Sequence, residues 1–98
     1  MLFVIRFYDK PDSLDIRNAH FDAHVRWLDA HRDVVLVPGA LRPAPHAPAV
    51  GGLWVAQAPD RETLERLVRT DPFWVHGLRE RYEIYVWHKA FPEREVAL

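Results

Sequence analysis

Four short stretches of the chain have the composition of β-strands, because β-branched and aromatic side chains are concentrated in them. They are residues 2–8, 34–41, 53–57 and 82–88. The Pro38-Gly39 pair predicts a kink or bulge within the second stretch. Turn-forming residues after the first stretch and the Gly51-Gly52 pair before the third mark boundaries between the predicted strands.

Two longer stretches have the spacing of helices. Residues 14–31 contain neither Gly nor Pro, and their apolar side chains recur at helical spacing on one side. A second helix is expected to begin after the N-cap residue Asp60 and to end at Asp71. Because Pro72 disfavours helical dihedrals at the residue before it, we expect residues 73–77 to form a separate turn.

The order of these elements is β-α-β-β-α-β, which is typical of the ferredoxin-like pattern. We therefore predict an α+β fold in which a four-stranded antiparallel sheet carries both helices on one face. Residues 42–50 are rich in proline and are expected to form a stiff connection between the second and third strands. With 98 residues, the chain is expected to form a single domain over residues 1–98, with residues 92–98 as a C-terminal tail.

Both faces of the predicted sheet are apolar, whereas a sheet with one wet face alternates apolar and polar residues. The two sides of the first strand carry Phe3, Ile5 and Phe7 against Leu2, Val4 and Tyr8. Two helices cover only one face, and each large apolar side chain left in water forfeits about 1.5–3 kcal/mol of burial free energy. We therefore expect a homodimer that pairs through the other face of the sheet. The alternative is a monomer whose aromatic face lines a ligand groove.

The charge of the chain argues against nucleic acid as a partner. The net charge is -1, so the chain lacks the excess of Lys and Arg by which proteins bind phosphates. An RNA-binding sheet with exposed aromatic side chains is disfavoured for the same reason. No stretch approaches the roughly 20 apolar residues of a membrane span. With no Cys and no signal-peptide pattern, a cytoplasmic protein without membrane partners is expected.

Polar side chains on the buried side of the predicted helices are the candidates for chemistry. His20, His24 and His31 lie on or beside the buried side of the first helix. The i, i+4 spacing of His20 and His24 suits a metal, but no third ligand is evident, so neither a metal nor a cofactor is expected. Asp71 points with the apolar stripe of Leu64 and needs a partner there. One of its oxygens can cap the next turn while the other faces a pocket.

Two groups of residues match the pattern of a known family. They are Asp9-Lys10-x-Asp12-Ser13-Leu14-x-x-Arg17 followed by His24, and Asp71-Pro72-Phe73 followed by Gly77. In this pattern the chain resembles the YciI-like family, the YCII-related domains of the dimeric α+β barrel superfamily. The resemblance implies that His24 and Asp71 form a His-Asp dyad in a pocket between the sheet and the helices. It also relates the chain to muconolactone isomerase and to barrels that bind haem through one histidine.

These residues together predict a small cofactor-independent acid/base enzyme. His24 is the expected general base and Asp71 its orienting partner, for isomerase, lyase or lactone-type chemistry on a small unsaturated or cyclic acid. Substrate contacts are expected from Tyr8, Arg17, Phe73 and Trp74. For a substrate carboxylate, Arg6 and Arg42 are alternatives to Arg17. The alternative function is a non-catalytic module or accessory subunit that binds a small ligand.

Overall fold

The computed structural model describes residues 1–98 and confirms the predicted α+β class and element order. The elements are β1 (Leu2–Asp9), α1 (Leu14–Ala30), β2 (Val35–Leu41), β3 (Gly51–Gln57), α2 (Arg61–Val68), α3 (Pro72–Val75) and β4 (Arg79–Val86). The expected turn after Pro72 is present as α3, and β4 begins at Arg79 rather than at Tyr82. None of the helices combines the length and the apolar character that crossing a membrane requires.

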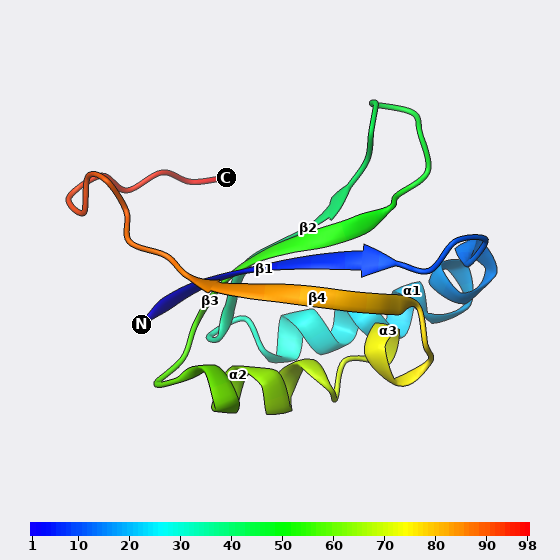
Figure 1. The fold of residues 1–98 in the computed structure, drawn as a ribbon, viewed down its shortest axis with the longest axis horizontal. Coiled ribbons are helices and arrows are strands. Elements are labelled where there is room, and N and C mark those ends of the chain that lie inside the picture. The colour runs from blue at the N-terminus through cyan, green and yellow to red at the C-terminus, as the bar shows by residue number, and fades with distance from the viewer.

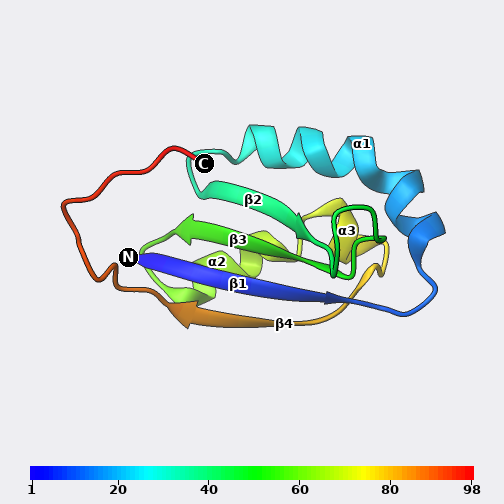
Figure 2. The same ribbon diagram turned by 90° about the horizontal axis from the view of Figure 1, so that it is seen from above.

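The four strands are antiparallel neighbours in the order β2-β3-β1-β4. Figure 1 shows the sheet edge-on with α1, α2 and α3 on one side of it, and Figure 2 looks onto the strands in this order. In the centre of the sheet, Ile5 of β1 lies opposite Trp54 of β3 and Ile84 of β4. Because side chains alternate along a strand, this register defines a helix-covered face and an open face.

The hydrophobic core lies between the sheet and the helices. Its buried members are Phe3, Ile5, Phe7, Val35, Trp54, Ala56, Ala58, Leu64, Val68 and Ile84. Helix α1 differs from the other elements, because its two buried residues are Arg17 and His24. Buried polar groups need hydrogen-bond partners, so the side chains that α1 places in the interior must find such partners there.

The ends of α2 and the start of α3 follow from their capping residues. Asp60 caps α2 as predicted, since its carboxylate accepts a hydrogen bond of 2.7 Å from the backbone N–H of Thr63. This bond holds the pKa of Asp60 below its usual value. The helix ends at Val68 rather than at Asp71. Asp71 has extended backbone dihedrals, as expected before Pro72, and becomes the N-cap of α3.

Gly77 follows α3 with a φ of 77°, in the left-handed region that favours glycine. We predict that Gly77→Ala lowers the free energy of unfolding by about 1–2 kcal/mol, because a residue with a Cβ atom is strained at this positive φ. Denaturant titration measures the change. Gly39→Ala is the control, since a Cβ there meets nothing within 4 Å. Equal destabilisation by the two substitutions would contradict this role of Gly77.

The open face of the sheet is apolar in one part and polar at one end. Its exposed apolar side chains include Val37, Leu53 and Tyr85. At the other end, the guanidinium groups of Arg6 and Arg81 lie over the ring of Tyr8, whose hydroxyl donates a 2.5 Å hydrogen bond to Glu83. The expectation of a wholly apolar second face is therefore wrong around Tyr8. The alternation of strand residues puts this polar cluster on the side away from the helices.

The residues after β4 turn back over the open side of the sheet (Figure 1). A hollow of about 700 Å³ lies between this segment and the sheet. Its lining includes Leu2, Val37 and Val55 from the sheet, and Phe91 and Val96 from the C-terminal segment. The open face therefore continues into an apolar hollow at the end opposite Tyr8.

Candidate active site

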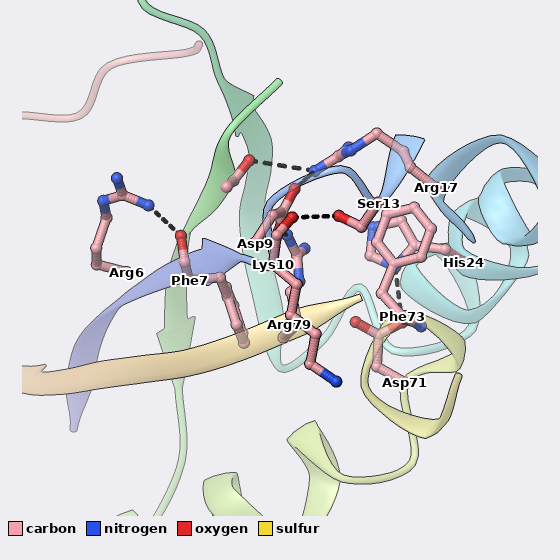
Figure 3. Close-up of polar contacts among 11 residues, drawn as sticks. Arg6, Phe7, Asp9, Lys10, Ser13, Arg17, His24, Asp71, Phe73 and Arg79 are labelled. Atoms are coloured by element: carbon pink, nitrogen blue, oxygen red, sulfur yellow. Dashed lines mark hydrogen bonds and ion pairs between the residues drawn. The ribbon is translucent and has the colours of Figure 1, made fainter. Parts of the chain in front are cut away.

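His24 of α1 and Asp71 at the start of α3 are hydrogen-bonded to each other in the interior. The distance from His24 Nδ1 to Asp71 Oδ1 is 2.7 Å, and the two side chains are 8% and 1% exposed. They are 47 residues apart in the sequence. Figure 3 shows the two side chains pointing toward one another from their separate helices.

One oxygen of Asp71 has two hydrogen-bond partners. Oδ1 accepts from His24 and also from the backbone N–H of Phe73, at 3.1 Å, which caps α3. Oδ2 is buried and has no partner. The cap of α3 and the contact with His24 therefore coexist on one oxygen of Asp71. Because the cap fixes Oδ1 relative to the backbone of α3, the position of the oxygen facing His24 is set by the helix itself.

The imidazole of His24 is held in one plane and one tautomer. Its ring stacks on the ring of Phe73, with the centroids 3.8 Å apart and the planes 11° from parallel. An ionised carboxylate only accepts hydrogen bonds, so we assign the proton of the neutral ring to Nδ1. Nε2 then carries the free lone pair and is the nitrogen able to accept a proton.

A cavity of about 310 Å³ lies beside His24. Its walls come from α1, from the end of β2 and the residue after it, and from β3 and β4, and they include Leu28, Trp54 and Arg42. Since Nδ1 of His24 is bonded to Asp71, Nε2 is the ring nitrogen left for a molecule in this cavity. The arrangement allows proton transfer between His24 and a small bound ring or chain.

Two buried arginines meet at a single carboxylate next to this cavity. Arg17 of α1 donates to Asp9 Oδ2 at 2.6 Å, and Arg79 of β4 donates to Asp9 Oδ1 at 2.7 Å (Figure 3). Arg79 is the more buried of the two, with a side chain that is 2% exposed. Burial lowers the pKa of Arg79, while the hydrogen bond and charge of Asp9 oppose this. Both arginines line the cavity.

A bulge in the sheet turns Arg79 toward the site. Along β1 and β4, Tyr8 pairs with Arg81 but Asp9 pairs with Arg79, so Glu80 is the extra residue. Without this shift, strand alternation would place Arg79 on the open face together with Arg81. Bulges re-aim side chains in this way and are frequent beside active sites.

A comparison with protein families identifies the chain. The family model of the YCII-related domain matches residues 1–88. The chain belongs to the YCII-related family. The resemblance inferred from the segments around Asp9 and Asp71 is confirmed. No curated protein matches the sequence.

Solved structures relate this YCII-related protein to dimeric α+β barrel proteins. One is the 5-chloro-2-hydroxyhydroquinone dehydrochlorinase TftG from Burkholderia phenoliruptrix AC1100, in complex with 2,5-dihydroxybenzoquinone. It is 26% identical, with a TM-score of 0.81 over 90% of this chain and 94% of that chain. An antibiotic biosynthesis monooxygenase is 18% identical, with a TM-score of 0.52 over 92% and 99% of the chains. SnoaB, a cofactor-independent oxygenase from Streptomyces nogalater, is 16% identical, with a TM-score of 0.51 over 94% and 96%.

The four predicted substrate contacts of this YCII-related protein lie in different places. Arg17 lines the cavity, and Phe73 is buried against the ring of His24. Tyr8 does not reach the cavity, because it lies on the open face of the sheet. Trp74 packs edge-on against Tyr82 of β4, with ring centroids 5.3 Å apart, and is not among the cavity-lining residues.

Sequence reasoning gave no role to Asp9 and Arg79, which meet next to the cavity. Asp9 stands in the family pattern, but nothing in the sequence links its carboxylate to Arg79, which lies 70 residues later. Arg42, an alternative to Arg17 for holding a carboxylate, does line the cavity, whereas Arg6 stacks on Tyr8 at the open face.

The other histidine of the i, i+4 pair has a different partner. His20 stacks on His76, with the ring centroids 3.6 Å apart and the planes 4° from parallel. No group of three or more His, Cys, Asp or Glu side chains has the arrangement of a metal site. His20 and His76 therefore add a second stacked pair between α1 and the end of α3.

Proposed function

We propose that this YCII-related protein is a small acid/base enzyme that acts without a cofactor on a small cyclic or unsaturated acid. His24 is the general base, and Asp71 orients it. The observation that supports this most directly is the 2.7 Å hydrogen bond between the buried side chains of His24 and Asp71, of which His24 lines a cavity. A nucleophile or base that is hydrogen-bonded to an orienting group beside a cavity is typical of active sites.

The chemistry follows from the tautomer of His24. Asp71 accepts a hydrogen bond from Nδ1–H of His24, which leaves Nε2 to take a proton from a carbon next to a carbonyl group. The electron pair of the broken C–H bond moves toward the carbonyl oxygen. It then either returns to another carbon with a proton from His24, which is an isomerisation, or expels a leaving group, which is an elimination. A positioned base of this kind contributes about 10²- to 10⁴-fold in rate.

The similarity to TftG supports the elimination form of this proposal. TftG is a dehydrochlorinase, a name that describes the removal of hydrogen and chloride from its substrate. It is 26% identical to this chain over 90% of the chain. We therefore place a lyase acting on an oxygenated ring first among the possible activities.

Solvent exchange tests the proposed activity without requiring the natural substrate. The protein is incubated in D₂O with a panel of small hydroxyquinones and unsaturated cyclic acids, and ¹H NMR follows the loss of C–H signals. Chloride release from 5-chloro-2-hydroxyhydroquinone is measured in parallel. Catalysed exchange or chloride release is expected for at least one compound. Binding without exchange or release would contradict an enzyme and support the ligand-binding module.

We also propose that two copies of the chain pair through the open face of the sheet. Tyr85 of β4 on this face is 57% exposed, and Leu53 of β3 and Val37 of β2 on the same face are also exposed. Apolar faces of this kind mark interaction sites. The two helices cover the opposite face, so a second copy supplies the cover that the open face lacks.

Light scattering tests the dimer with two matched substitutions. The wild-type protein is expected to have the mass of two 11.5-kDa chains. Tyr85→Lys is expected to give single chains, because an ammonium group is costly to bury in an interface. Val75→Lys is the control, since Val75 is 60% exposed but lies on α3. Dissociation by both substitutions, or by neither, would argue against pairing through this face.

A further inference from the structure

The cavity beside His24 carries an excess of positive charge. Its 12 lining residues include Arg17, Arg42 and Arg79, and none is Asp or Glu. The carboxylates that touch these groups are already engaged, because Asp9 is bonded to Arg17 and Arg79 while Asp71 is bonded to His24. A ligand in this cavity therefore meets arginine side chains and no free acid.

Arg17 and Arg79 share one negative charge between two positive ones. Both are more than nine-tenths buried, and the Nε–H group of each has no hydrogen-bond partner. A buried charge that is not fully paired is costly in free energy. One negative oxygen added near the two guanidinium groups would balance the charge of this cluster, because Asp9 supplies a single carboxylate.

The backbone around Arg79 leaves room for its guanidinium group at the cavity. The bulge in β4 directs Arg79 to the helix-covered face. Gly52 lies next to it, and a Cβ at that position would be 3.2 Å from Nη2 of Arg79 and 3.1 Å from the carbonyl oxygen of Gly39. The carbonyl belongs to the backbone and cannot easily give way. A residue larger than glycine at position 52 would therefore crowd the guanidinium group.

We infer that Arg79, together with Arg17, binds an anionic oxygen of the ligand, and that the ligand class is a small ring bearing a phenolate, enolate or carboxylate. This inference rests on the proposed function in one respect, since it places the ligand in the cavity where His24 is to act. Asp9 is a positioning residue, because it holds the two guanidinium groups side by side. Arg42 adds a third positive charge to the cavity wall.

This assignment also gives Arg79 a role in the proposed reaction. When His24 removes a proton from carbon, negative charge develops on the adjacent carbonyl oxygen. Hydrogen-bond donors fixed in a site with little water stabilise such charge strongly, because they need no reorganisation during the reaction. The guanidinium groups of Arg17 and Arg79 are such fixed donors, because their hydrogen bonds to Asp9 hold them in place.

A pair of probes that differ in charge tests the inference by calorimetric titration. 2,5-Dihydroxybenzoquinone is an anion at neutral pH, and 2,5-dimethoxybenzoquinone is its neutral analogue with the same ring. The anion is expected to bind the wild-type protein at least about 10-fold more tightly, the gain expected from a charge-assisted hydrogen bond. Equal affinities of the two probes, or no binding of the anion, would overturn the inference.

Substitution of Arg79 provides the second measurement. Arg79→Gln is expected to weaken binding of the anion by about 10- to 100-fold and to change affinity for the neutral probe by less than about 2-fold. Arg66→Gln is the control, because Arg66 is an exposed residue of α2 outside the cavity. A folded Arg79→Gln protein that keeps its affinity for the anion would overturn the inference. If this variant does not fold, the affinities of the wild-type protein for the two probes still test whether the cavity prefers an anion.

The outcome for this inference is separable from the outcome for the proposed function. Anion binding that depends on Arg79, without turnover of any compound, would leave the inference standing and refute the enzyme. Turnover that depends on His24, with equal affinity for charged and neutral probes, would support the enzyme and refute the inference about Arg79.

Discussion

His24→Ala is expected to lower kcat by about 10²- to 10⁴-fold, the contribution of a positioned general base. The substitution removes the nitrogen that is proposed to accept the proton and leaves the arginines of the cavity in place. Affinity for an anionic probe is therefore expected to stay within about 3-fold, well below the tenfold change that 1.4 kcal/mol produces. Steady-state kinetics on the compound identified by solvent exchange gives both kcat and KM.

Two further variants show whether the loss of kcat comes from the loss of proton transfer or from a change in structure. His24→Gln keeps a polar side chain in contact distance of Asp71 but cannot take up a proton, so it should be as inactive as His24→Ala. His88→Ala replaces an exposed histidine after β4 and should leave kcat unchanged. A His24→Ala protein that is folded and still turns over at the wild-type rate would refute the assignment of His24 as the base.

Asp71→Asn is expected to lower kcat by about 10²- to 10⁴-fold with little change in KM. An amide oxygen can still accept from the Phe73 N–H and cap α3, so the substitution keeps the local fold. It removes the negative charge that is proposed to hold His24 in the Nδ1–H tautomer. Kinetics and a thermal melt measured on the same sample separate the loss of activity from a loss of stability.

Asp60→Asn makes the same chemical change at another helix N-cap and is the matched control. Asp60 accepts from the Thr63 N–H at the start of α2 and has no role in the cavity. Its substitution should leave kcat unchanged. Equal losses of activity at the two positions would mean that capping, and not the contact with His24, explains the effect of Asp71→Asn.

The elements of the fold were predictable from local sequence patterns. Hydrophobic periodicity located all four strands and the two longer helices, and Pro72 located the break before α3. The ends were less accurate, since α2 stops at Val68 and β4 starts at Arg79. Such ends depend on hydrogen bonds made after the chain has folded, which the local sequence does not determine.

The candidate site was predictable only in part. The contact between His24 and Asp71 was expected from the family resemblance and is present. Tyr8 was misplaced, because alternation along a strand separates two faces without saying which of them the helices cover. Arg79 was missed for a stronger reason. Its direction depends on a bulge at Glu80, and a shift of one residue moves every side chain to the other face.

One wall of the cavity is formed by Pro38, Gly39 and Ala40 of β2 and by Arg42 after it. The side chains proposed to act on the ligand, His24 and Arg79, come from α1 and β4. The two sets of residues therefore belong to separate parts of the chain. It follows that mutational libraries confined to residues 38–40 should shift preference among related compounds without abolishing the proposed chemistry. The end of the edge strand β2 is thus the part of the molecule to vary when a new specificity is sought.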